Sequence, residues 1–286
     1  MNSSSIVSAI RKFLLLSSVL VVLFDDGIIA GPRLRRAISE SEGNPLAIIP
    51  PFLDRRHRND WESALQLVRQ EFVVFLYRDA AVIYSEADFV NTGSDTLRTE
   101  LSLPSTGFAC DEESGGQDIS NGIRDVRLWL ARERIEPVLH HDAEVDWFTV
   151  TAVFTPQVQT TVRALFWVET PTGTDSVDRA IGIPVSKAAI WKDVINSVDV
   201  TVILKEGITT DDSLFEADPD SYSVEDSVLT WSFGNIEPSQ SDDISILYNS
   251  PQPHFIDASI RENLSRFVIE HVYDEMLEYV RESEEE

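Results

Sequence analysis

Cysteine and positive charge are both scarce in this chain of 286 residues. The single cysteine, Cys110, cannot form an internal disulfide, which excludes a disulfide scaffold. Lys and Arg total 23 against 49 Asp and Glu, so the formal net charge is -26. Such a charge repels phosphate backbones and anionic lipid surfaces at long range, and we therefore expect no nucleic-acid partner.

Catalytic motifs are missing as well. The sequence contains no GxSxG elbow, no HExxH pair and no CxxC pair, and Gly115-Gly116 lacks the lysine and the following helix of a phosphate-binding loop. Cys110 lies in an acidic loop, which disfavours a reactive thiolate. The sequence thus favours a protein that is not an enzyme, and a hydrolase with an unfamiliar site ranks third among our hypotheses.

Residues 1–30 have the order of a secretory signal peptide. Arg11 and Lys12 precede an apolar run from Phe13 to Phe24. Cleavage is expected after Ala30. The run is about 12 residues long and would span roughly 18 Å as a helix, short of the ~30 Å hydrocarbon core. We therefore predict export to the periplasm or the cell exterior, with no stable membrane span after cleavage. An uncleaved N-terminal anchor is the alternative.

Residues 31–69 are predicted to form an arm rich in proline and arginine that ends in a short helix. Asp60 is a suitable N-cap for a helix containing Trp61, Leu65 and Val68. The basic arm either docks on a partner or lies on the acidic body of its own chain. Its prolines and arginines are Pro32, Arg33, Arg35, Arg36, Pro45, Pro50, Pro51, Arg55, Arg56 and Arg58.

The body of the chain shows the period-two alternation of half-buried strands. About ten strands follow one another with turn signals roughly 8 to 12 residues apart, as expected of sandwiches. The run Asn91 to Asp95 is a strong turn, and Pro171 to Asp175 indicates a boundary or a long loop. We predict a mostly β fold made of two β-sandwich-like units, at residues 70–170 and 171–252.

One pair of strands is especially clear. Val198, Val200 and Val202 alternate with polar residues in the first strand, which we expect to open near Ile190 and Trp191. Leu229, Trp231 and Phe233 alternate in its partner. This context favours packing of both tryptophans in the core over a role in a binding site.

In the C-terminal segment the spacing of the apolar residues differs from that of the strands. Apolar residues recur at spacings of three and four, which predicts an amphipathic C-terminal α-helix over residues 256–283. Its polar face is acidic, so packing on the sandwich or in a homo-oligomer seam is favoured over a membrane surface. The apolar positions are Ile260, Leu264, Phe267, Val268, Val272, Met276, Leu277 and Val280.

The loop at residues 209–226, between the two clear strands, is the first candidate site. Carboxylate oxygens are the ligands that calcium prefers, although the spacing does not match an EF-hand. We therefore predict no obligatory cofactor, with calcium as the alternative and the loop as a calcium-dependent surface for glycan or protein. The candidate ligands are Asp211, Asp212, Glu216, Asp218 and Asp220.

His140 and His141 are a second, weaker candidate for a metal site. They stand beside Asp142, Glu144 and Asp146, but consecutive residues of an extended chain point to opposite faces. An exposed polar turn is the simpler interpretation.

Three strand and turn patterns carry a resemblance to known proteins. They are Glu71 to Pro104, Asp146 to Trp167, and Ile190 to Lys192 taken with Trp231 to Pro238. Together they resemble a family of uncharacterised exported bacterial proteins with N-terminal β-sandwich domains of unknown function. The run Asn91 to Leu97 also resembles turns of bacterial immunoglobulin-like modules. The resemblance implies export and a non-catalytic sandwich, and it assigns no site residues.

Taken together, these patterns predict an exported, acidic, non-catalytic protein that acts as a binding or structural component of the periplasm or cell surface. Its expected partner is another protein or a component of the cell surface.

Overall fold

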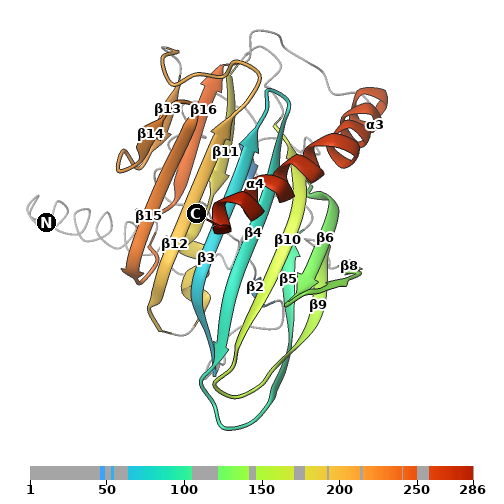
Figure 1. Cartoon of the computed structure of the whole chain (residues 1–286), viewed down its shortest axis with the longest axis vertical. Coiled ribbons are helices and arrows are strands. Elements are labelled where there is room, and N and C mark those ends of the chain that lie inside the picture. The colour runs from blue at the N-terminus through green and yellow to red at the C-terminus, as the bar shows by residue number, and fades with distance from the viewer. Residues whose placement is uncertain are drawn as a thin grey trace, which may run out of the picture.

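The computed structural model describes residues 46–48, 53–54, 64–104, 122–141, 146–170, 178–191, 193–212, 215–239, 241–249 and 258–285. These residues form three β-sheets and a C-terminal helix, which confirms the mostly β fold class predicted from the sequence (Figure 1). The signal-peptide pattern, Cys110 and the run Pro171 to Asp175 lie outside the described residues.

The largest sheet has eight strands in the order β14-β15-β12-β3-β4-β10-β6-β7. Neighbouring strands are antiparallel except β3 and β12, which pair in parallel with Val200 opposite Phe72. The strands are β3 (Leu65–Leu76), β4 (Ala80–Asn91), β6 (Arg124–Leu130), β7 (Glu133–Ile135), β10 (Gln159–Glu169), β12 (Ile195–Leu204), β14 (Ser223–Glu225) and β15 (Val228–Ile236).

Two four-stranded sheets pack against one face of the large sheet. One has the order β1-β11-β16-β13 and the other β2-β5-β9-β8. Their inward side chains, such as Ile181, Ile246, Leu101 and Val150, share one apolar core with the large sheet. The strands are β1 (Leu46–Ile48), β2 (Leu53–Asp54), β5 (Leu97–Pro104), β8 (Val138–His141), β9 (Asp146–Phe154), β11 (Asp178–Ile183), β13 (Glu216–Asp218) and β16 (Ile244–Asn249).

The C-terminal helix covers the other face of the large sheet, which confirms the amphipathic helix predicted there. It comprises α3 (Ala258–Phe267), a π-helical turn (Val268–Val272) and α4 (Tyr273–Glu285), and it crosses in front of the sheet in Figure 1. Its apolar side, including Met276, is buried in a second core with residues of β3, β4 and β10. None of the described helices combines the length and apolar character needed to cross a bilayer.

The predicted strand pair is confirmed, with one change at its start. β12 and β15 pair antiparallel with Val200 opposite Trp231, and both predicted core tryptophans are buried. The first strand does not open at Ile190, because a 3₁₀ turn (Val185–Ile190) occupies that position. Trp191 follows this turn and packs edge-on against Phe89, with ring centroids 4.9 Å apart.

The short helix predicted before residue 70 is wrong, because β3 begins at Leu65. Leu65 and Leu67 alternate with half-exposed neighbours, as in a strand whose one face is buried. A β-bulge between Leu67 and Arg69 then shifts the alternation by one residue, and this shift imitates the three-residue spacing of a helix.

The boundary predicted near residue 170 does not interrupt the large sheet. The first predicted unit supplies β3, β4, β6, β7 and β10, although β3 begins before residue 70. The second predicted unit supplies β12, β14 and β15. The parallel pairing of β3 with β12 joins the two sets of strands within one sheet.

Candidate functional site

The five acidic residues predicted as calcium ligands are spread over the connection between β12 and β14. Asp211 and Asp212 are exposed in a turn, Glu216 and Asp218 lie in β13, and Asp220 is exposed just beyond that strand. Among the described residues, no group of three His, Cys, Asp or Glu side chains is placed to hold a metal ion. Calcium binding by this loop stays a prediction from the sequence.

The two histidines lie in β8, at the edge of a small sheet. His140 is opposite Trp147, while the Nδ1 of exposed His141 lies 2.8 Å from Oδ1 of Asp146 in β9. Adjacent residues of a strand point to opposite sides, so His140 and His141 do not converge. Asp142 and Glu144 lie outside the described residues.

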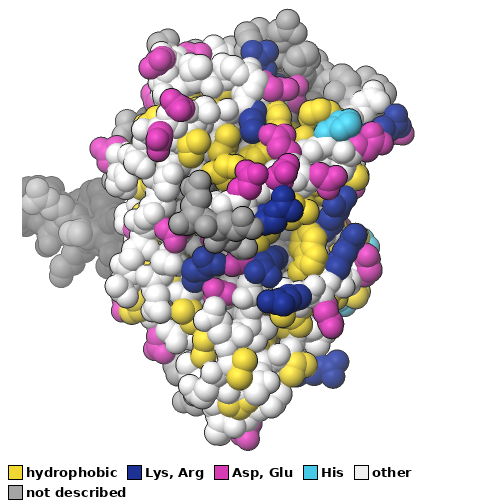
Figure 2. Space-filling model, in the orientation of Figure 1, with side chains coloured by type: hydrophobic (Ala, Val, Ile, Leu, Met, Phe, Trp, Pro, Cys, Tyr) yellow, Lys and Arg dark blue, Asp and Glu magenta, His cyan; other side chains and the backbone are white. Residues whose placement is uncertain are grey.

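A polar network occupies the part of the large sheet that the helix leaves uncovered. Figure 2 shows Lys and Arg side chains gathered on this part of the face, next to the helix, in a chain whose net charge is negative. The network lies on β3, β4 and β10, the same strands that carry the apolar core under the helix. We call it the sheet-face network, and its members are Arg69, Glu71, Tyr84, Glu86, Asp88, Thr161 and Arg163.

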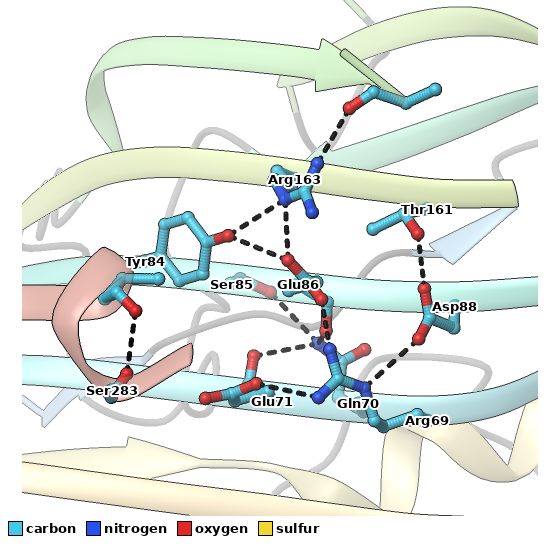
Figure 3. Close-up of polar contacts among 12 residues, drawn as sticks. Arg69, Gln70, Glu71, Tyr84, Ser85, Glu86, Asp88, Thr161, Arg163 and Ser283 are labelled. Atoms are coloured by element: carbon cyan, nitrogen blue, oxygen red, sulfur yellow. Dashed lines mark hydrogen bonds and ion pairs between the residues drawn. The ribbon is translucent and has the colours of Figure 1, made fainter. Parts of the chain in front are cut away.

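Glu86 of β4 is the centre of the sheet-face network. Its Oε2 accepts hydrogen bonds from the Tyr84 hydroxyl at 2.8 Å and from Nε of Arg163 at 2.6 Å. Its Oε1 forms an ion pair with Nη2 of Arg69. Figure 3 shows Tyr84, Glu86 and Arg163 pointing toward one another from two neighbouring strands. Arg163 also donates from Nη1 to the carbonyl of Ala131 at 2.7 Å.

Arg69 of β3 links two further carboxylates to this centre. Its Nε lies 3.1 Å from Oδ2 of Asp88, and its Nη1 lies 3.2 Å from Oε2 of Glu71. The other oxygen of Asp88 accepts a hydrogen bond from Thr161 at 2.6 Å. The carboxylates of Glu86 and Asp88 are only 5% and 8% exposed, so their pairing with arginine offsets the cost of their burial.

The hydroxyl of Tyr84 is held neutral in this environment. Burial, and then the negative charge of Glu86, raise the pKa of Tyr84, although Arg163 opposes this shift. A protonated hydroxyl that already donates to Glu86 cannot serve as a general base. Each charged member of the network has a charged partner, and the network therefore ties β3, β4 and β10 together.

A buried arginine in β11, a strand of one four-stranded sheet, fixes the turn between β3 and β4 of the large sheet. Arg179 of β11 is fully buried, and its Nη2 lies 2.6 Å from Oδ1 of Asp79 in that turn. Its Nη1 donates to the carbonyl of Thr170, whose own hydroxyl donates to the carbonyl of Arg78 at 3.2 Å. These contacts hold the carbonyl of Arg78 and the following residue, Asp79, in place.

Next to this turn lies a cavity of about 140 Å³, which we call the loop cavity. The loop after β12 forms one wall, since the backbone N–H of Lys205 donates to Leu76 and that of Arg78 donates to Glu206. Gly207 follows with a φ of +75°, a conformation that glycine adopts without strain. The lining residues are Arg78, Gly207, Ile208, Thr209, Asp212, Phe215, Tyr248 and Asn249.

One charged group of the loop cavity has no partner within the part of the chain that the structure describes. The guanidinium of Arg78 makes no hydrogen bond or ion pair with these residues. Asn249 also lines the cavity, but its side-chain oxygen Oδ1 has almost no accessible surface and accepts no hydrogen bond, so it does not face the cavity. Tyr248 is different, because its hydroxyl donates to the carbonyl of Tyr77 at 3.3 Å and its pKa is raised, mainly by burial.

Sequence reasoning missed Arg78 and Asn249. The run Tyr77-Arg78-Asp79 joins two apolar strands, and a charged residue in such a turn is ordinary. Asn249 ends the last strand and stands beside a turn-forming Ser-Pro pair, which offers an equally ordinary explanation. Of the five predicted calcium ligands, only Asp212 lines the loop cavity, together with Thr209 and Phe215 from the same loop.

Comparison with known proteins identifies a fold and no family. No protein-family model and no curated protein matches the sequence. The chain is similar to the crystal structure of a candidate nutrient binding protein from Legionella pneumophila, at 12% identity and a TM-score of 0.54, with 70% of each chain covered. An M1 zinc metallopeptidase from Deinococcus radiodurans matches at 10% identity and a TM-score of 0.38, over 68% of this chain and 43% of the other.

Proposed function

We propose that this chain is an exported, non-catalytic binding protein that holds a small polar solute in the loop cavity. The observation that carries the proposal is the Arg78 guanidinium, which has no hydrogen-bond or ion-pair partner among the described residues, at a cavity of about 140 Å³. A guanidinium presents paired donors that match a carboxylate or another planar acceptor.

The fold supports a binding role. The Legionella protein with a similar fold is described as a candidate for nutrient binding, and its fold covers most of both chains. Export is supported by Arg11, Lys12 and the apolar run that follows them. Fractionation of the native host should find the processed chain in the periplasm or outside the cell. A cytosolic chain that keeps residues 1–30 would contradict export.

Binding is favoured over catalysis because of the chemistry of the two polar regions. Every charged group of the sheet-face network is paired, and Tyr84 stays protonated. The described residues that line the loop cavity include no histidine or cysteine to act as a base or nucleophile. A hydrolase therefore remains the third hypothesis, after a calcium-dependent surface-binding module.

The test is a melting-temperature screen with small solutes. Carboxylates, amines, zwitterions and neutral polyols are added in turn to the wild-type protein and to the Arg78→Gln variant. A solute that binds only the folded state stabilises it by RT ln(1 + [L]/Kd), about 2.7 kcal/mol at 100 times the Kd. We expect at least one class to stabilise the wild-type protein and to have no effect on the variant. No shift with any class, or equal shifts in both proteins, would refute the proposed function.

A further inference from the structure

Residues 131–141 run along the edges of two sheets and bury little surface. β7 is the last strand of the eight-stranded sheet, and β8 is the last strand of one four-stranded sheet. Only Glu136 and Pro137 separate these two strands in the chain. Ile135, Pro137 and His140 are partly buried, and every other residue of this stretch is exposed. We call residues 131–141 the edge segment.

The backbone of the edge segment can accept a further strand. The outer sides of β7 and β8 pair with no other strand in the described part of the chain. In a hairpin with a two-residue turn, the pair of residues that flanks the turn exchanges hydrogen bonds and the next pair does not. Leu130 and Glu133 flank the turn, so the N–H and C=O of Arg134, the partner of Trp129, point outward. Such free groups pair readily with another extended chain.

The side chains next to this free edge are basic and aromatic on the face of the large sheet that the helix packs on. Trp129 lies directly opposite Arg134, and Arg127 lies two residues before Trp129 on the same face. The guanidinium of Arg127 lies 4.6 Å from the ring centroid of Tyr273 and has no carboxylate partner among the described residues. Arg134 is 56% exposed, and its Nη2 lies 3.8 Å from the equally exposed carboxylate of Glu136, which is a weak contact.

The other acidic residue of the hairpin points to the opposite face. Glu133 is the partner of Leu130, and Leu130 packs against the core between the sheets. Adjacent residues of a strand point to opposite sides, so Glu133 and Arg134 lie on different faces of β7. The alternation of the strand thus leaves a basic face beside the free edge, in a chain whose net charge is -26.

β8 adds exposed apolar side chains to the same segment. Val138 is 56% exposed and Leu139 is 43% exposed. Because they are adjacent in a strand, they lie on opposite sides of β8. A chain that passes along this edge would therefore find an aliphatic contact on either side.

We infer that the edge segment binds an extended acidic segment of a partner protein. The partner chain would add a strand to β7, and its alternate carboxylates would contact Arg127 and Arg134. Tryptophan and arginine are the residue types that carry much of the binding energy at protein interfaces, and Trp129 lies between these two arginines. The edge segment shares no residue with the loop cavity, so this inference does not depend on the proposed function.

The chemistry of the segment favours a peptide over other acidic partners. A free backbone edge and the aliphatic side chains of Val138 and Leu139 match a polypeptide better than a hydroxyl-rich glycan. A second copy paired through the same edge would bring the arginines of both copies together, and like charges opposite each other destabilise a strand pair. The rest of the acidic chain repels a carboxylate-rich partner, which restricts its attraction to the basic face.

Fluorescence anisotropy with a labelled peptide tests the inference. The probe is Thr-Glu-Val-Glu-Val-Glu-Thr, and in the comparison peptide glutamine replaces each glutamate. We expect the glutamate peptide to bind the wild-type protein at low salt and the glutamine peptide to bind about tenfold more weakly or less. Binding should also weaken at about 1 M salt, where the screening length is ~3 Å.

Two N-methylated forms of the probe test the added strand without changing the protein. One carries the methyl groups on its glutamate nitrogens and the other on its valine nitrogens, so each form blocks one edge of the extended peptide. One form should bind as the unmodified probe does, and the form whose blocked edge faces β7 should bind about tenfold more weakly. Equal binding of all three forms would refute strand addition.

Variants of the protein locate the site. The double variant Arg127→Gln and Arg134→Gln should weaken binding of the glutamate peptide by about tenfold, and Leu139→Asp should weaken it as well. Arg98→Gln is the matched control, because Arg98 is an exposed arginine of β5, which β9 separates from β8. The control should leave the affinity unchanged.

Three results would overturn the inference. The first is a glutamate peptide that does not bind, or that binds the double variant as tightly as the wild-type protein. The second is tetragalacturonate binding more tightly than the peptide, which would make the partner an anionic glycan. The third is a wild-type dimer in sedimentation that Leu139→Asp abolishes, which would make the partner a second copy of the chain.

Discussion

The sheet-face network and the loop cavity both contain arginine, but they differ in how its charge is used. In the network, Arg69 and Arg163 contact carboxylates of their own and neighbouring strands. At the cavity, the guanidinium of Arg78 has no such partner among the described residues. Charges that are paired within the fold stabilise it, whereas an unpaired group at a cavity is available to a ligand. The comparison thus contrasts a structural polar region with the region that we propose for binding.

The largest expected effect comes from three buried tyrosines, of which Tyr84 lies in the network, Tyr248 at the cavity wall and Tyr273 in α4. Burial is the first cause of the raised pKa of Tyr84, Tyr248 and Tyr273, and each is at most 3% exposed. An unfolded tyrosine titrates near pH 10, so the stability from these three groups is complete below that pH and is lost above it. The free energy of unfolding should fall by nearly 1.4 kcal/mol per tyrosine for each further pH unit.

Urea unfolding at pH values from 9 to about 11.5 measures this slope. Tyr84→Phe and Tyr248→Phe should each remove about a third of the slope that the three tyrosines produce. The two variants thus compare the network with the cavity wall directly. A slope that both substitutions leave unchanged would show that these hydroxyls are not held neutral in the folded protein.

The next prediction tests whether the network stabilises the fold without taking part in ligand binding. Glu86→Gln keeps the shape of the side chain but removes the charge that Arg69, Arg163 and Tyr84 share. Because both arginines are partly exposed, we expect a loss of about 2 to 3 kcal/mol, below that of a fully buried pair. Ligand affinity at the loop cavity should not change.

Glu71→Gln is the control for this substitution. Glu71 contacts the same Arg69, but its side chain is 28% exposed, and the expected loss is below about 1 kcal/mol. Equal losses for the two variants in urea unfolding would contradict the central position of Glu86.

The smallest expected effect has the opposite sign. Asn249→Leu replaces a buried oxygen that accepts no hydrogen bond by an apolar side chain with the same branching and the same number of non-hydrogen atoms. The variant should therefore be as stable as the wild-type protein or about 1 kcal/mol more stable. A clear loss of stability in thermal unfolding would show that the side chain of Asn249 is paired in the folded protein.

Period-two alternation predicted most strands, because a strand buried on one face alternates regardless of its partner. It could not predict the parallel pairing of β3 with β12, which depends on contacts between residues more than 120 positions apart. The bulge at Leu67 and Arg69 also breaks the alternation, which is why the start of β3 was predicted as a helix.

The two polar regions were less accessible to sequence analysis. Glu71, Glu86 and Arg163 lie in otherwise apolar strands, and this contrast is a usable signal for a buried polar network. Their pairing, however, requires the register of three strands. Arg78 and Asn249 meet only because β16 ends beside the turn between β3 and β4, as the contact from Tyr248 to Tyr77 records. No local pattern in the sequence predicts that these two residues line the same cavity.

The most direct test measures the free energy of unfolding of the wild-type protein and of Arg78→Gln, each with and without the solute that stabilises the wild-type protein in the melting-temperature screen. The solute should stabilise the wild-type protein in proportion to its saturation and should leave the variant unchanged. Equal stabilisation of both proteins, or no stabilisation of the wild-type protein by any solute class, would contradict the assignment of the loop cavity as a binding site.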